Sequence, residues 1–181
     1  MNRNMIKINF LITGTCGAGK TTLVQELKKR QLNNFIVYDF DDCGVPDGAD
    51  VTWRKKATRN WLKTLKESNS KGYHTILCGG SVPPEVLECP EYEESLNIHF
   101  GFIKASDALV KERLQERNWD IKQIEDNINW AICLERFVKI QPNHFLLDST
   151  VNTPEQVADS ALDYINKVCS NPLILSSEIE D

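Results

Sequence analysis

The 181-residue sequence contains no apolar run close to the roughly 20 residues that a membrane-spanning helix needs, because charged residues interrupt its longest hydrophobic stretches. Its first residues also lack the apolar core and the small-residue cleavage site of a secretory signal. We therefore expect a cytoplasmic protein with no membrane partner. A chain of this length corresponds to about one domain, and it can bury about 70% of its unfolded surface without help from disulfides or a metal.

Positive charge is not in excess either, since 26 Asp and Glu residues outnumber 21 Lys and Arg residues and give a net charge of −5. Nucleic-acid-binding proteins usually carry a basic footprint, so we expect no nucleic-acid partner. The six cysteines form no C-x-x-C pair and the three histidines are far apart, which argues against a structural zinc site. We interpret the cysteines as reduced residues. Internal repeats and linkers are also missing.

Short apolar runs instead alternate with helical patterns, which is typical of a parallel sheet covered by helices. Strands are predicted at residues 6–12, 35–38, 74–78, 97–103 and 145–147. Helices are predicted from about residue 20, at 50–66, from 106 toward 117, at 121–140 and at 154–168, with a short segment at 85–87. We expect one domain over residues 1–170 and an acidic tail over residues 171–181.

The most informative segment is Gly14-Thr15-Cys16-Gly17-Ala18-Gly19-Lys20-Thr21, which fits the P-loop pattern G-x-x-x-x-G-K-[ST] between a predicted strand and a predicted helix. Glycines let backbone N–H groups surround phosphate oxygens, and the helix N-terminus adds its dipole. Lys20 would hold the β- and γ-phosphates of ATP, and the Thr21 hydroxyl would complete the shell of Mg²⁺. Thr22 belongs to the same predicted nucleotide site. The alternative interpretation is a glycine-rich turn that binds no ligand.

Other classes of P-loop protein lack support. A GTPase would carry Asn-Lys-x-Asp for guanine, and this motif does not occur. The third predicted strand is followed by Gly79-Gly80 rather than by Asp-x-x-Gly. Motor and transporter ATPases would need a longer chain. The remaining class is that of small phosphoryl-transfer proteins, with a three-layer α/β P-loop NTPase fold and a five-stranded parallel sheet.

Asp39 and Asp41 follow the second predicted strand, at the edge of the sheet where open α/β folds bind ligands. A carboxylate there can hold Mg²⁺ or accept the proton of an attacking hydroxyl. The two side chains share one side only if the extended geometry continues past Asp39. The alternative interpretation is an acidic loop start that caps the next helix.

The predicted helix at 50–66 carries four basic residues near its start, and most of them suit a solvated face. Arg54 and Arg59 flank the expected core residues Trp53 and Trp61. Either arginine could form a fork with a carboxylate or phosphate of the acceptor. The sequence leaves open which of the two binds the substrate.

Together these motifs resemble the shikimate and gluconate kinase branch of the nucleoside-monophosphate-kinase-like P-loop proteins. The resemblance rests on the P-loop, Asp39-x-Asp41, Gly79-Gly80 and Glu112-Arg113-Leu114-x-x-Arg117. It implies that Asp39 lies by Mg²⁺ and the reacting hydroxyl, and that Asp41 binds the acceptor with Gly79 and Gly80. Trp53-Arg54 is similar to a substrate-binding pair of shikimate kinases, whereas Arg59-Asn60-Trp61-Leu62 is similar to a stretch of gluconate kinases.

The resemblance also implies a short mobile lid at about residues 117–122, with Arg113 and Arg117 at the nucleotide and Arg117 completing the catalytic site. The lid lacks the extra arginines of shikimate kinases, and Gly79-Gly80-Ser81 replaces their three glycines. Shikimate itself is therefore not the expected acceptor.

We predict an ATP-dependent kinase that uses ATP and Mg²⁺ to phosphorylate a hydroxyl of a small metabolite, with a sugar-acid or shikimate-like acceptor. A nucleoside or nucleoside-monophosphate kinase is the first alternative, and base stacking on Phe40 or Trp53 would favour it. A non-catalytic ATP-binding regulatory protein is the second. The sequence allows a monomer or a homodimer. Cys16 could make the P-loop sensitive to oxidation, or it could simply be small enough to fit there.

Overall fold

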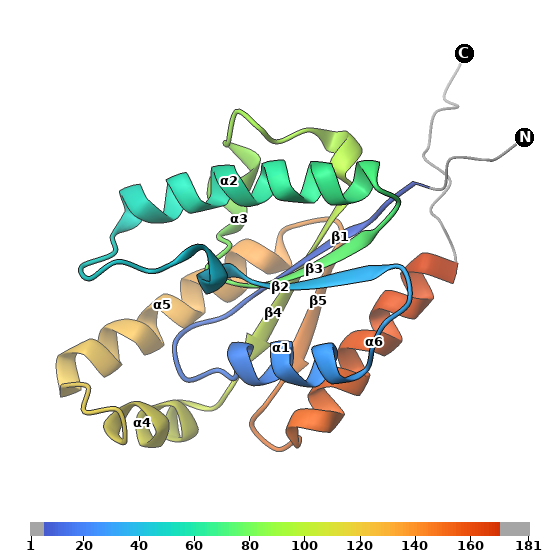
Figure 1. Cartoon of the computed structure of the whole chain (residues 1–181). Coiled ribbons are helices and arrows are strands. Elements are labelled where there is room, and N and C mark those ends of the chain that lie inside the picture. The colour runs from blue at the N-terminus through green and yellow to red at the C-terminus, as the bar shows by residue number, and fades with distance from the viewer. Residues whose placement is uncertain (1–5, 171–181) are drawn as a thin grey trace, which may run out of the picture.

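The computed structural model describes residues 6–170, so the predicted acidic tail at 171–181 lies outside the described residues. Five strands form one parallel sheet in the order β2-β3-β1-β4-β5 (Figure 1). The strands are β1 (Asn9–Thr13), β2 (Phe35–Asp39), β3 (His74–Gly79), β4 (Ile98–Lys104) and β5 (His144–Asp148). The predicted α/β class, the five-stranded parallel sheet and the three layers are confirmed.

Six α-helices and two short 3₁₀-helices connect or follow these strands within the described residues. The α-helices are α1 (Lys20–Lys29), α2 (Val51–Ser70), α3 (Pro83–Leu87), α4 (Asp107–Gln115), α5 (Ile121–Lys139) and α6 (Pro154–Ser170). The 3₁₀-helices are η1 (Phe40–Cys43) and η2 (Glu94–Leu96). None of these helices combines the length and the apolar character that crossing a membrane requires.

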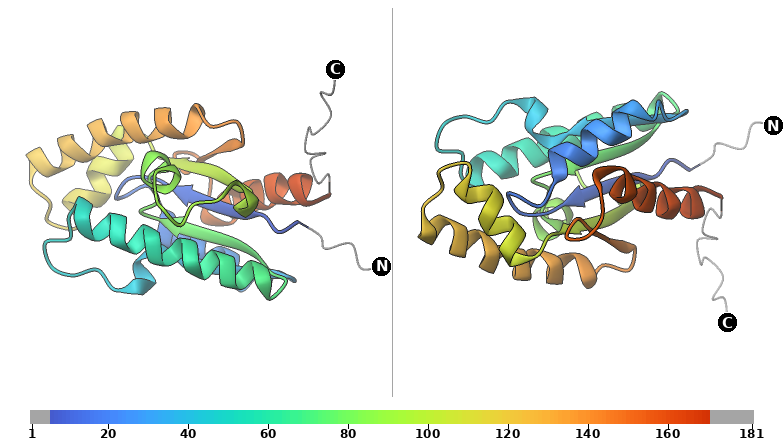
Figure 2. Two further views of the ribbon diagram at one scale, coloured as in Figure 1. Left: turned by 90° about the horizontal axis from the view of Figure 1, so that it is seen from above. Right: turned by 90° about the horizontal axis from the view of Figure 1, so that it is seen from below.

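The α-helices cover both faces of the sheet. Helices α1 and α6 pack on one face through Leu23, Leu27 and Ala161. Helices α2, α3 and α5 pack on the other, with Trp61 and Leu134 in that layer of the core. Figure 2 shows α2, α3 and α5 over the sheet in one view and α1 and α6 in the other. Because helices cover both faces, every residue of β1 is buried, as expected for a central parallel strand.

Helix starts follow the sequence closely because side chains satisfy the free N–H groups there. The Asp50 side chain accepts a hydrogen bond from Trp53 N at 2.8 Å at the start of α2. Asp120 and Gln123 form a reciprocal capping box at the start of α5. Thr153 and Gln156 form another box at the start of α6, since Thr153 N donates to Gln156 Oε1 at 2.9 Å and Gln156 N donates to Thr153 Oγ1 at 3.3 Å.

Two boundaries differ from the predictions by three or more residues. Strand β1 begins at Asn9 rather than at residue 6, and α2 continues to Ser70 instead of ending near residue 66. The extra turn of α2 keeps Ser68 buried, and its hydroxyl donates to Thr64 O at 2.9 Å. The chain reverses only at Gly72, where φ is 90°, a conformation that suits glycine.

The strand register brings the ends of β2, β3 and β1 to one edge of the sheet. Asp39 pairs with Cys78 across β2 and β3, and Ile12 pairs with the same Cys78 across β1 and β3. The P-loop after β1 and the acidic turn after β2 therefore leave the sheet at the same level. Ligands of open α/β sheets bind at this edge, where the strand order reverses.

Gly79 ends β3 under the first residue of η1. A Cβ atom on Gly79 would lie 2.2 Å from the Cβ of Phe40, and the φ angle of Gly79 is 145°. Phe40 is fully buried, and its carbonyl accepts a hydrogen bond from Trp61 Nε1 at 2.9 Å. Phe40, which lies between Asp39 and Asp41 in the turn, thus packs directly against the backbone of Gly79.

We predict that Gly79→Ala lowers the free energy of unfolding by about 2–5 kcal/mol, because overpacking adds to backbone strain. Gly48→Ala is the control, since Gly48 also has a positive φ of 73° but has open space around its Cβ position. The control should lose only about 1–2 kcal/mol. Urea unfolding measures both values, and equal losses would contradict the close approach of Phe40.

His99 is a titratable group inside the core, with 2% of its surface exposed. Its Nδ1 pairs with the Tyr164 hydroxyl at 2.9 Å, whereas Nε2 has no hydrogen-bond partner among the described residues. Burial lowers the pKa of His99 from 6.5 to about 4. The unfolded chain therefore binds a proton at a higher pH than the folded chain does.

As the pH falls from 7 to 4, we predict that the wild type loses up to about 3 kcal/mol of unfolding free energy relative to His99→Gln. Protonation favours the unfolded wild type in this window, and glutamine does not titrate. Urea unfolding of both proteins at several pH values measures the difference. A difference that stays constant with pH would show that His99 is not buried in its neutral form.

Candidate active site

The P-loop lies between the end of β1 and the start of α1. Gly17 and Gly19 adopt positive φ angles of 81° and 102°, which residues with a side chain rarely do. Gly19 caps α1, whose first turn contains no acidic residue. The loop therefore presents the positive end of a helix dipole to the edge of the sheet, as an anion-binding site requires.

Lys20 lies at the centre of the predicted site residues. Its Nζ donates a hydrogen bond to Thr15 O at 2.8 Å. Burial lowers the pKa of the Lys20 ammonium, the nearby carboxylates of Asp41 and Asp39 oppose this change, and the charge of Arg117 adds to it. Lys20 also lines one cavity with Asp41 and Arg117, so residues from three separate segments lie around it.

Two cavities flank the P-loop, with volumes of about 140 Å³ and 180 Å³. The smaller cavity is lined by Cys16, Gly17, Gly19, Lys20, Thr21, Thr22, Asp41 and Arg117. The larger cavity is lined by Gly17, Gly19, Thr22, Leu23, Ile103, Arg113, Arg117, Ser149, Asn152, Pro154 and Val157. Arg117 borders both cavities, and the larger one has the more apolar wall.

Asp39 and Asp41 occupy different positions because the extended geometry ends at Asp39. The chain turns into η1, and an oxygen of the Asp39 carboxylate accepts a hydrogen bond from Asp41 N at 3.1 Å. Asp39 is therefore a cap, as the alternative interpretation holds, while Asp41 lines the smaller cavity. Partial desolvation of its carboxylate and the charge of Asp39 raise the pKa of Asp41.

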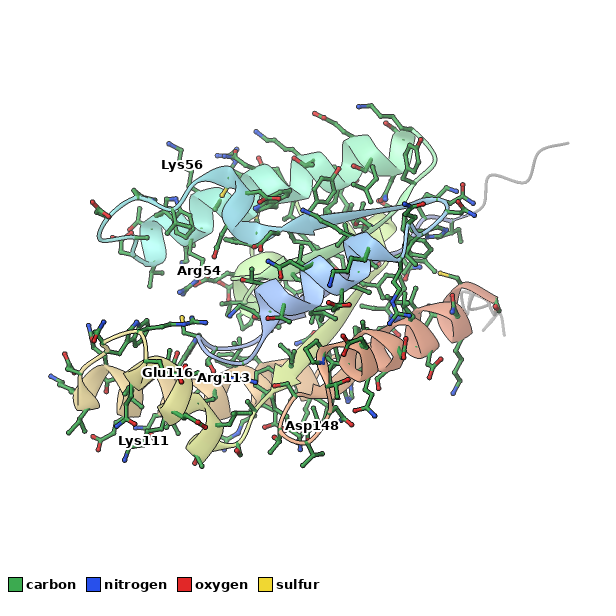
Figure 3. The ribbon with its side chains drawn as sticks, turned by 60° about the horizontal axis from the view of Figure 1, so that its bottom comes forward. Arg54, Lys56, Lys111, Arg113, Glu116 and Asp148 are labelled. Carbon is green, nitrogen blue, oxygen red and sulfur yellow. The ribbon has the colours of Figure 1, made fainter. Side chains whose placement is uncertain are left out.

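The two candidate acceptor arginines lie at different places on α2. Arg54 forms a fork with Glu85 of α3, with Nε and Nη2 at 2.8 Å and 2.7 Å from the two carboxylate oxygens. Arg59 pairs with Glu91 and leaves 54% of its side chain exposed, against 25% for Arg54. In Figure 3, Arg54 points toward the side of α4 and α5, whereas Lys56 points away.

Gly79 and Gly80, the other predicted acceptor residues, pack against Phe40. Neither glycine lines the two cavities beside the P-loop. Their observed contacts support the turn that carries Asp41. A direct contact with the acceptor stays a prediction.

Two further residues contact the P-loop, and neither is among the predicted site residues. The Ser149 hydroxyl after β5 donates to Ala18 O at 2.8 Å, and the Asn127 side chain of α5 contacts Cys16. Arg113, a predicted nucleotide residue, donates from Nη1 to Gly17 O at 2.7 Å. Only the folded chain brings these residues to the loop.

The connection between α4 and α5 spans residues 116–120, close to the predicted lid. Asn118 has a φ angle of 60°, and Trp119 N donates to Leu114 O at 3.1 Å. The connection is short and hydrogen-bonded in this conformation. Its movement as a lid stays a prediction.

The chain belongs to the AAA domain family, whose model AAA_18 matches residues 11–134. No curated protein sequence matches the chain significantly. A sugar kinase from Janibacter sp. has a TM-score of 0.61 at 15% sequence identity, over 91% of this chain and 97% of that one. These findings, with the sheet order, give the chain the fold of P-loop kinases, as the resemblance implies.

Two other solved structures support the same fold. A gluconokinase from Sinorhizobium meliloti has a TM-score of 0.61 at 15% identity, over 96% of this chain and 99% of that one. A thymidylate kinase from Candida albicans has a TM-score of 0.59 at 14% identity, over 89% and 92%. At such identities the likeness establishes the fold alone.

Proposed function

We propose that the protein is an ATP-dependent kinase that transfers the γ-phosphoryl group of ATP to a hydroxyl of a small metabolite, a sugar acid or a shikimate-like compound. The observation that carries this proposal is the cavity in which Lys20, Thr21, Asp41 and Arg117 meet beside the P-loop. A phosphate site, a carboxylate and a cation are groups that phosphoryl transfer uses.

The nucleotide would lie across the P-loop from one cavity to the other. The wall formed by Leu23, Ile103 and Val157 suits the adenine ring, because nucleotide bases favour apolar surroundings with a few polar groups. The phosphates would then face the N-terminus of α1. Lys20 would exchange its hydrogen bond with Thr15 O for the phosphate oxygens, and Arg117, which borders both cavities, would contact them.

Magnesium fits the oxygen donors on the acceptor side of the loop. Mg²⁺ prefers hydroxyl, carboxylate and water oxygens, which Thr21 and Asp41 offer at one cavity and Asp39 offers nearby. Partial desolvation and the negative charge of Asp39 raise the pKa of Asp41. A bound cation would offset the repulsion between the two carboxylates. Bound Mg²⁺ would neutralise charge on the phosphates.

The chain's own residues would carry the transfer. The acceptor oxygen forms a bond to the γ-phosphorus while the bond from that phosphorus to the bridging oxygen of ADP breaks. The hydroxyl proton passes to a carboxylate, for which we propose Asp39, while Asp41 holds the acceptor. Lys20 and Arg117 would stabilise the charge on the transferring group.

Asp39→Asn should lower turnover by about 100-fold or more, the usual contribution of a positioned base, and should change ATP affinity by less than about threefold. Asparagine keeps the cap on η1, because its amide oxygen can still accept from Asp41 N. Steady-state kinetics and calorimetry separate the two effects. A variant that keeps the wild-type rate would rule out Asp39 as the base.

For the acceptor arginine, we expect Arg54→Lys to raise the KM for the acceptor by about tenfold or more, because lysine cannot reproduce a forked, charge-assisted contact. The KM for ATP should stay the same. Arg59→Lys is the matched control, since Arg59 forms an exposed ion pair of the kind that contributes little. Acceptor kinetics that respond to Arg59→Lys and not to Arg54→Lys would reverse the assignment.

The proposal is tested by ADP formation from ATP and Mg²⁺ with a panel of sugar acids, shikimate, nucleosides and nucleoside monophosphates, with Lys20→Ala as the blank. Turnover with sugar acids or shikimate-like compounds supports the proposal. Turnover with nucleosides would favour the first alternative, although Phe40 is fully buried and is not available to stack on a base. ATP binding without turnover would favour a regulatory protein.

A further inference from the structure

Side chains hold four successive carbonyl groups of the P-loop. Thr15 O accepts from Lys20 Nζ at 2.8 Å, Cys16 O from Asn127 Nδ2 at 3.0 Å, Gly17 O from Arg113 Nη1 at 2.7 Å and Ala18 O from Ser149 Oγ at 2.8 Å. Three of these donors lie outside the motif, on α5, on α4 and after β5. The backbone of the loop is therefore held by elements far from it in sequence.

A held carbonyl determines where the next N–H group points. The peptide unit is planar and trans, so the N–H of one residue points opposite to the C=O of the residue before it. The bond from Asn127 to Cys16 O thus orients Gly17 N–H, and the bond from Ser149 to Ala18 O orients Gly19 N–H. Gly17 and Gly19 line both cavities beside the loop.

Asn127 differs from the other donors because it makes two bonds to one residue. Its Oδ1 accepts from Cys16 N at 3.1 Å, and its Nδ2 donates to Cys16 O at 3.0 Å. Only a side chain that both donates and accepts can make this pair, and a neutral amide does so without adding charge beside a phosphate site. An ionised carboxylate could accept but not donate, and it would repel phosphate.

We propose that Asn127 is a positioning residue for the nucleotide phosphates. It fixes the peptide between Cys16 and Gly17 so that Gly17 N–H faces the phosphate oxygens. Arg113 of α4 donates to the next carbonyl, that of Gly17. Both α4 and α5, the helices on either side of the 116–120 connection, therefore form hydrogen bonds to the P-loop. This inference rests on the proposed ATP site, and its test measures nucleotide binding without any acceptor.

The experiment compares the binding of ATP with Mg²⁺ by calorimetry in the wild type, Asn127→Ala, Asn127→Asp and Asn129→Ala. Asn129 is the matched control, because it is the same residue type, two positions away on α5 and exposed. Asn127→Ala should weaken binding about 10- to 100-fold, because losing one well-placed hydrogen bond to a charged phosphate costs about that much affinity. Asn129→Ala should bind as the wild type does.

Asn127→Asp tests whether the affinity for ATP depends on the protonation of this side chain, which a purely structural role would not predict. At pH 7 its carboxylate should weaken binding more than alanine does. As the pH falls toward 4, close to the ordinary aspartate pKa of about 3.9, binding relative to the wild type at the same pH should recover in part, because a protonated carboxyl can again donate to Cys16 O and accept from Cys16 N. This variant has the shape of asparagine, so it decides the question even if Asn127→Ala does not fold.

The outcomes separate two failures. If the wild type binds ATP and Asn127→Ala binds it equally well, the positioning role is wrong while the proposed function stands. An Asn127→Asp variant whose relative affinity does not change with pH would overturn the role as well. If the wild type itself does not bind ATP with Mg²⁺, the proposed function fails, and this inference fails with it.

Discussion

The parallel pairing of β1 between β3 and β4 is the constraint on which the site depends. It places the end of β1 at the centre of the sheet, where the strand order reverses. Because β1 is wholly buried, the loop after it leaves a rigid support. The same register brings the turn after β2 to that level, so that Asp39 and Asp41 act on Lys20 across the sheet edge. The order and register of the strands therefore bring the residues of the candidate site together.

Much of this arrangement could be predicted from local sequence. The P-loop pattern, the alternating apolar runs and the capping residues Asp50, Asp120 and Thr153 each act within a few residues, so a single sequence contains the whole signal. Boundaries were less certain, because buried contacts extend α2 beyond its local pattern. The cap role of Asp39 was one of two open interpretations, since it depends on whether the chain stays extended.

What could not be predicted comes from pairs distant in sequence. Asn127 lies 111 residues from Cys16, and no spacing rule connects them. Arg54 forms its forked ion pair with Glu85 of another helix. The sequence does not indicate this pair, so it could not be used to choose between Arg54 and Arg59. In each case the polar partner is set by how α2, α3 and α5 pack on the sheet. The electrostatics of the site are thus a tertiary property, whereas its phosphate-binding loop is a local one.

The central claim is that these groups act together on ATP to move a phosphoryl group to a small hydroxyl compound. The most direct measurement is ³¹P NMR of the protein with ATP, Mg²⁺ and a mixture of sugar acids. The account predicts a new phosphomonoester signal that grows as the γ-phosphate signal falls and ADP appears in equal amount. Loss of the γ-phosphate signal only to inorganic phosphate, with no ester formed from the sugar acids, would contradict it.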